Sequence, residues 1–169
     1  MKQIILAAAI FLMSLSSNTS SAQTIGDVSI ILPGIAAEKI FEASATEVNA
    51  RAVKDFSRSF KNAPGAKWFK SDKGYFASFD NNGTNTKIVY DSKGRRNYSI
   101  ISYPESKLDR QIKSRVMSVY FDATIIGVHQ FEFENKTIHV IKMLDQDSTP
   151  MTLAVTDEQI QDITTRTKN

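Results

Sequence analysis

Residues 66–103 alternate apolar and polar side chains in four short runs separated by glycine-containing turns. Asn82-Gly83 supplies two residues that tolerate positive φ, as a two-residue hairpin loop requires, and the glycines of Asp72-Lys73-Gly74 and Ser92-Lys93-Gly94 suit the last position of three-residue loops. The pattern predicts a meander of four antiparallel strands. These strands are Ala66–Ser71, Tyr75–Asp80, Thr84–Tyr90 and Arg95–Tyr103.

The loop lengths determine which side chains of the meander share a face, because side chains alternate along a strand. A three-residue first loop pairs Phe69 with Ala77, the Asn-Gly loop pairs Ala77 with Ile88, and a three-residue last loop pairs Ile88 with Tyr98. One face is then predicted to be the core: Phe69, Tyr75, Ala77, Phe79, Ile88, Tyr90, Tyr98 and Ile100. The other face is polar with a large apolar streak: Lys70, Ser78, Lys87, Asn97 and Ser99, with Trp68, Phe76, Val89 and Ile101.

Amphipathic helices are expected on either side of the meander. Ser44 and Glu47 have capping-box spacing, Val53 and Phe56 follow at helical intervals, and Pro64 disfavours helix at the residue before it. After the meander, a second apolar stripe has helical spacing: Leu108, Ile112, Val116, Val119 and Tyr120. Both helices need an apolar surface to cover their stripes, and the core face of the meander provides one.

Three further strands are expected after the second helix, at Ile125–Phe133, Thr137–Leu144 and Met151–Val155. The predicted fold class is therefore α+β, in the order helix, four strands, helix, three strands. In the predicted arrangement, one antiparallel β-sheet carries two helices packed on one face.

The first 22 residues have the organisation of a signal peptide. Lys2 precedes an apolar run over residues 4–13, and Ser20-Ser21-Ala22 is a small-residue cleavage site. The run is too short to span a membrane as a stable helix, although an uncleaved anchor is the alternative. The expected organisation is a signal peptide over 1–22, an N-terminal leader or linker over 23–46, the α+β domain over 47–165 and a tail over 166–169. A periplasmic or secreted protein that does not span the membrane after processing is predicted.

Composition narrows the function classes. The 169 residues include no cysteine, which excludes disulfides, a thiol nucleophile and lipid attachment at an N-terminal cysteine. The net charge is +3 and falls to +2 when Lys2 leaves with the signal peptide. So small an excess gives no indication of nucleic-acid binding.

No catalytic or cofactor motif is present. A two-residue loop at 135–136 would project His129 and His139 to opposite faces of the sheet, where they could not share a metal. Gly-x-Ser-x-Gly and the phosphate-binding loops are absent. The aspartates are typical turn residues: Asp72, Asp80 and Asp91. We therefore expect no enzyme activity, no catalytic residues, no metal and no cofactor.

The apolar streak on the polar face is the one candidate binding surface. Large amphipathic side chains on a polar background are typical of recognition surfaces. The candidate partner-binding residues are Trp68, Phe76, Val89, Lys70 and Lys87. The alternative is that Val28–Phe41, or a second copy of the chain, covers this face as ordinary core.

Several stretches, spread over residues 47–155, carry a family resemblance: Phe56–Phe60, Ala63–Trp68, Tyr75–Phe79, Lys87–Asp91, Gly94, Val119–Asp122 and Ile125–Val128. In these the chain resembles the exported PepSY-like proteins of Bacteroidetes-type bacteria, which are grouped by fold with the β-lactamase inhibitor proteins. It departs from them at Leu108-Asp109, where Leu-Pro is usual. The resemblance implies an antiparallel sheet backed by helices, an envelope location and no enzyme activity.

The function predicted from the sequence is that of an exported non-catalytic binding domain that contacts an envelope or secreted protein, with a hydrolase as one candidate. The alternative is a small-ligand carrier with a pocket between the sheet and the helices. Such a pocket needs polar groups that converge in an apolar cavity, and the predicted core face offers mainly tyrosine hydroxyls. The oligomeric state and the identity of the partner are left open.

Overall fold

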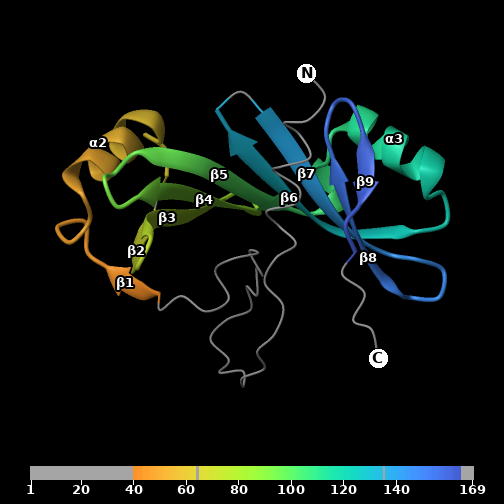
Figure 1. Ribbon diagram of the computed structural model, residues 1–169, viewed down its shortest axis with the longest axis horizontal. Coiled ribbons are helices and arrows are strands. Elements are labelled where there is room, and N and C mark those ends of the chain that lie inside the picture. Colours follow the sequence, from red (N-terminus) through yellow and green to blue (C-terminus); the bar gives the residue numbers. More distant parts are fainter. Residues whose placement is uncertain (1–39, 64, 135, 165–169) are drawn as a thin grey trace. The chain divides into compact units, whose positions relative to one another are not determined.

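The computed structural model describes residues 40–63, 65–134 and 136–164 (Figure 1). The predicted signal peptide and most of the predicted leader lie outside them. In the described part the chain forms one sheet of nine strands, and every strand pairs antiparallel with its neighbours in sequence. The elements are β1 (Phe41–Ala43), α2 (Ala50–Ser59), β2 (Lys67–Ser71), β3 (Gly74–Asn81), β4 (Thr84–Asp91), β5 (Arg96–Tyr103), a short 3₁₀ helix η1 (Glu105–Lys107), α3 (Arg110–Val119), β6 (Thr124–Phe133), β7 (Lys136–Leu144), β8 (Pro150–Val155) and β9 (Ile160–Asp162).

The α+β fold class is confirmed, with a larger sheet than expected. The short strands β1 and β9 add one strand to each edge of the predicted set. β1 falls within the predicted leader and pairs with β2, with Ala43 opposite Trp68. In the described part, α2 and α3 have ten residues each, and neither has the length or the apolar character needed to cross a membrane.

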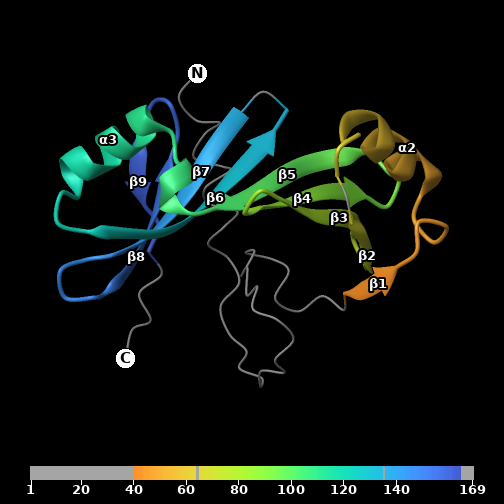
Figure 2. The ribbon, with the colours of Figure 1, turned by 180° about the vertical axis from the view of Figure 1, so that it is seen from behind.

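Both helices cover the same face of the sheet, which we call the helix face; its opposite is the outer face (Figures 1 and 2). The register shows this, because Ile88, Ser99 and Glu132 lie opposite one another and Val128 is on the Glu132 side of β6. Under α2 the buried cluster is Val48, Ala52, Phe56, Trp68, Ala77, Phe79, Ile88 and Tyr90. Under α3 it is Leu108, Val116, Ala123, Ile125, Val128, Ile141, Met143, Leu153 and Val155.

The helix α2 begins later than its sequence pattern predicts. The Ser44–Glu47 interaction does form, because the Ser44 backbone N–H donates to the Glu47 carboxylate at 2.8 Å. It closes a separate turn ahead of the helix. Asn49 is the residue that caps α2, and its Oδ1 accepts from the Arg51 backbone N–H at 3.0 Å.

Asp109 is the N-cap of α3. Its Oδ1 accepts from the backbone N–H groups of Gln111 at 2.8 Å and Ile112 at 3.2 Å. The helix ends at Val119. Val119, the last residue of the helix, is 60% exposed and does not belong to the buried stripe that the sequence predicted. Val116 is fully buried.

Replacing Asp109 with Ala should lower the free energy of unfolding by about 1 kcal/mol, because two backbone N–H groups lose their acceptor. Asp109→Asn keeps an acceptor oxygen and should lower the free energy of unfolding by only about 0.3 kcal/mol. Urea unfolding of the two variants measures the difference. Equal losses in both would show that the negative charge, and not the cap, is what stabilises α3.

The first hairpin has a two-residue loop, so the predicted three-residue loop is wrong. Ser71 pairs with Gly74, and hence Trp68 with Ala77 and Phe69 with Phe76. Gly74 has a φ of +151°, and a Cβ there would lie 2.2 Å from the Tyr90 backbone oxygen. The glycine is thus required by the close approach of β4.

The last hairpin of the meander contains a bulge. Asn81 pairs with Thr84 and Tyr90 with Arg96, both as predicted. Between Tyr90 and Val89 the register then shifts, because Val89 pairs with Tyr98 and leaves Asn97 as an extra residue. Ile88 therefore faces Ser99. Tyr98 and Ile100 lie on the outer face, and not on the core face where the sequence had placed them.

Candidate functional site

A band of large apolar side chains crosses the outer face from β2 to β6. The ring centroids of Phe69 and Phe76 are 4.7 Å apart at an interplanar angle of 12°. Tyr98 contacts Phe133 at 5.6 Å, and Phe131 lies 6.3 Å from Phe133 in a stacked arrangement. We call these residues the outer aromatic band: Phe69, Phe76, Val89, Tyr98, Ile100, Phe131 and Phe133.

Neither helix of the described residues covers this band. Every sheet residue in the two buried helix-side clusters belongs to the helix face. Of the band, Ile100 is fully buried and the other six side chains are partly exposed. The described part of the sheet therefore has a packed side and a second side on which six of the seven side chains of the band are partly exposed.

Lys87 lies within the band, opposite Ile100 of β5. Its Nζ is 5.9 Å from the centre of the Phe76 ring, a cation–π distance. Burial lowers the pKa of Lys87, which is the expected effect of removing water from an ammonium group. No described carboxylate lies within ion-pair distance of it. A half-buried positive charge thus lies beside an aromatic ring.

A polar row borders the band. Asn85 donates from Nδ2 to the Asp80 carboxylate at 3.0 Å, and Ser102 Oγ is hydrogen-bonded to His129 Nδ1 at 2.8 Å. Asn85 Oδ1 is buried and, among the described residues, has no hydrogen-bond partner. The Ser102–His129 pair projects from strands and not from a sharp strand-to-helix turn, the position that presents a serine nucleophile. The row thus places mostly paired polar side chains along the edge of the band.

The two histidines project to opposite faces, as predicted, although their partners differ: Gln130 lies opposite His139, and Val140 opposite His129. Burial lowers the pKa of His129, and the positive charges of Lys142 and Lys87 lower it further. Burial likewise lowers the pKa of His139.

Stability should consequently fall as the pH drops from about 7 toward 5. Each folded-state histidine pKa lies below the unfolded value of about 6.5, so in this window the unfolded chain binds more protons than the folded one. His129→Gln should flatten the dependence of the urea midpoint on pH. An unchanged slope in that variant would contradict the burial of the His129 ring. Carboxylates with a lowered pKa, such as Glu47 and Asp91, lose their stabilising contribution as the pH falls below about 5, and this loss is common to the variant and the wild type, so the comparison between them isolates His129.

The five candidate residues from the sequence divide between the two faces. Phe76, Lys87 and Val89 lie together on the outer face. Trp68 is 8% exposed and packs under α2, with ring centroids 5.3 Å from Phe56 and 5.7 Å from Tyr90. The expectation that Trp68 shares a face with Phe76 is therefore wrong, because the two-residue loop reverses β2. Lys70 is exposed on the same face of β2 as Trp68.

The sequence pattern did not identify five members of the band. Phe69, Tyr98 and Ile100 were assigned to the core face by the wrong register, and Phe131 and Phe133 were not among the candidates. The alternation of Phe131, Glu132 and Phe133 along β6 was a signal for two rings on one face.

No protein-family model matches this sequence, and no curated protein matches it. Solved structures do resemble it. A DUF2874 family protein from Bacteroides ovatus ATCC 8483 has a TM-score of 0.59 at 18% identity and covers 69% of this chain and 88% of its own. A BLIP-like protein from Bacteroides fragilis NCTC 9343 has a TM-score of 0.57 at 17% identity, with 71% and 90% covered. A second DUF2874 family protein, from Bacteroides uniformis ATCC 8492, has a TM-score of 0.57 at 15% identity, with 68% and 88% covered. The chain shares the fold of these proteins, a BLIP-like fold.

Proposed function

We propose that the chain is an exported, non-catalytic binding domain whose outer aromatic band docks an envelope or secreted protein. The observation that carries the proposal is Lys87, a half-buried ammonium group within an accessible aromatic surface. Removing water from a charge is unfavourable unless a partner compensates for it. A partner carboxylate would compensate for the desolvation of Lys87 while apolar groups cover the rings.

The band has the composition of an interface centre. Aromatic anchors surrounded by polar groups dominate the energetics of protein interfaces. Here the rings lie on neighbouring strands of one sheet, which restricts their motion, so docking would order few side chains. The expected partner surface is apolar at its centre and carries a carboxylate opposite Lys87. A hydrolase remains one candidate for this partner.

The exported location rests on the signal-peptide pattern of residues 1–22. The BLIP-like description of one structural neighbour fits a protein-binding role, and assignment to the PepSY-like proteins is proposed from the quoted stretches. The carrier alternative needs space between the sheet and the helices. Ala52, Ala77 and Val116 are fully buried at those contacts, which favours docking on the outer face instead.

A photo-crosslinking amino acid at position 76, introduced into the full chain in its native cells, tests the proposal. Position 121 is the matched control, because Phe121 is an aromatic residue that is 78% exposed and lies outside the band. We expect one protein to crosslink at position 76 and not at 121, and the purified protein to bind this chain directly. Crosslinks within the chain alone, or the same products at both positions, would contradict the proposal.

A further inference from the structure

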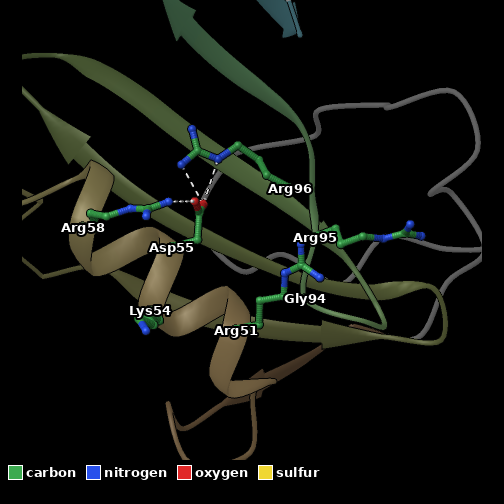
Figure 3. Close-up of a pocket in the computed structure, with 7 residues that line it drawn as sticks. All are labelled: Arg51, Lys54, Asp55, Arg58, Gly94, Arg95 and Arg96. Carbon is green, nitrogen blue, oxygen red and sulfur yellow. Dashed lines mark hydrogen bonds and ion pairs between the residues drawn. The ribbon is translucent and has the colours of Figure 1, made fainter.

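A second feature lies away from the outer face, where α2 meets the turn between β4 and β5 (Figure 3). A cavity of about 320 Å³ is lined by five basic side chains and one carboxylate. They are Arg51, Lys54, Arg58, Arg95 and Arg96, with Asp55. We call this cavity the basic groove.

Asp55, the single carboxylate of the groove, already forms hydrogen bonds and ion pairs with neighbouring side chains. Asp55 Oδ2 accepts from the Tyr90 hydroxyl at 3.0 Å and from Arg96 Nε and Nη2 at 2.9 and 2.7 Å. Asp55 Oδ1 lies 3.6 Å from Arg58 Nη2. Arg95 pairs with Asp91 at 2.7 Å, and Figure 3 shows it pointing away from Asp55. Arg51 and Lys54 have no carboxylate within ion-pair distance in the described part of the chain.

The walls of the groove are held in place. Arg96 Nη2 also donates to Ser59 Oγ at 2.6 Å, and its guanidinium lies 5.1 Å from the centre of the Phe60 ring. On the other wall, Gly94 has a φ of +72°, and a Cβ there would lie 2.6 Å from Asn49 Oδ1. The turn therefore rests directly against the start of α2, and Arg51 extends toward it (Figure 3).

We propose that the basic groove binds a phosphate group. The positive charges of the guanidinium and ammonium groups in the groove outnumber the single negative charge of Asp55. Guanidinium donors also match the geometry of phosphate oxygens. A fixed Arg96 and a rigid turn reduce the ordering that binding would require. The phosphate group is carried by a free phosphate compound or by a lipid headgroup. The groove is formed by α2 and the β4–β5 turn, so this site is independent of the outer aromatic band.

Calorimetric titration of the purified protein with inorganic pyrophosphate tests the site, with acetate at equal ionic strength as the monovalent control. The variant Arg51→Glu/Lys54→Glu leaves Asp55 and Arg96 intact. Arg110→Glu is the control for a charge reversal away from the groove, with half the charge change of the double variant, because Arg51 and Arg110 are exposed residues in the first turns of α2 and α3, where a negative charge does not oppose the helix dipole.

We expect the double variant to weaken pyrophosphate binding at least about tenfold, the effect of losing one charged contact, and Arg110→Glu to change it less than about twofold. Lys87→Glu on the outer face should leave it unchanged. Equal weakening in the double variant and in Arg110→Glu, or acetate binding as tightly as pyrophosphate, would overturn the site.

Vesicles distinguish the two sources of phosphate. If a headgroup is the ligand, the protein should sediment with phosphatidylglycerol vesicles but not with pure phosphatidylcholine vesicles, and the double variant should lose this binding. Pyrophosphate binding without vesicle binding would identify a free phosphate compound. If neither pyrophosphate nor the anionic vesicles bind, the proposal is wrong.

Discussion

Trp68→Ala is expected to lower the free energy of unfolding by about 3–5 kcal/mol, the usual cost of removing a buried aromatic side chain. Trp68 is 8% exposed and contacts the rings of Phe56 and Tyr90, so its loss leaves a cavity between α2 and the sheet. Urea unfolding followed by circular dichroism measures the change.

Lys70→Ala is the control for Trp68→Ala. It lies two residues further along the same face of β2 but is exposed, so it should change stability by no more than about 0.5 kcal/mol. Emission from the single tryptophan should be blue-shifted and protected from acrylamide. A loss at Trp68 as small as that at Lys70, or readily quenched emission, would show that α2 does not pack on this side of the sheet.

Lys87→Met is expected to act in opposite directions on stability and on partner binding. In the isolated protein it removes a half-buried charge that has no described ion-pair partner, so the urea midpoint should stay equal or rise. In the complex it removes the cation that pairs with the partner, so affinity should fall by about 2–5 kcal/mol. If Lys87 had only a structural role, Lys87→Met would lower the stability and the affinity together.

Phe76→Ala should weaken the same complex by about 2 kcal/mol or more, as truncation of a central aromatic anchor does. Phe121→Ala removes an equally large ring that is 78% exposed and should leave affinity unchanged. Titration calorimetry with the purified partner measures both variants. Similar effects from Phe76→Ala and Phe121→Ala would contradict the role of the band.

The architecture was predictable because its signals are local and repeated. The stripe on α3 and the alternation along the strands require an antiparallel sheet with helices on one face, whatever the detailed register. The prediction that His129 and His139 project to opposite faces of the sheet was also correct, although the predicted register was not. The predicted and observed pairings of β6 and β7 differ by an even number of residues, which leaves each side chain on the same face.

The candidate site was less predictable, because a shift of one residue exchanges the faces of a strand. The glycine of Asp72-Lys73-Gly74 was interpreted as the last residue of a loop, whereas Gly74 begins β3 and is needed because the Tyr90 carbonyl lies so close. That one difference moves Trp68 into the core and Phe69 to the outer face. Likewise, the bulge at Asn97 moves Tyr98 and Ile100 across the sheet. Both causes lie in contacts between strands, which a local sequence pattern does not contain.

Hydroxyl-radical footprinting of the complex, with oxidation quantified ring by ring, tests most directly whether the outer face is the binding surface. We predict that partner binding protects Phe69, Phe76, Phe131 and Phe133 and leaves Phe41 and Phe121, both strongly exposed, as reactive as in the free protein. Protection confined to Phe41 and Phe121, with the rings of the outer aromatic band as reactive as before, would contradict the account.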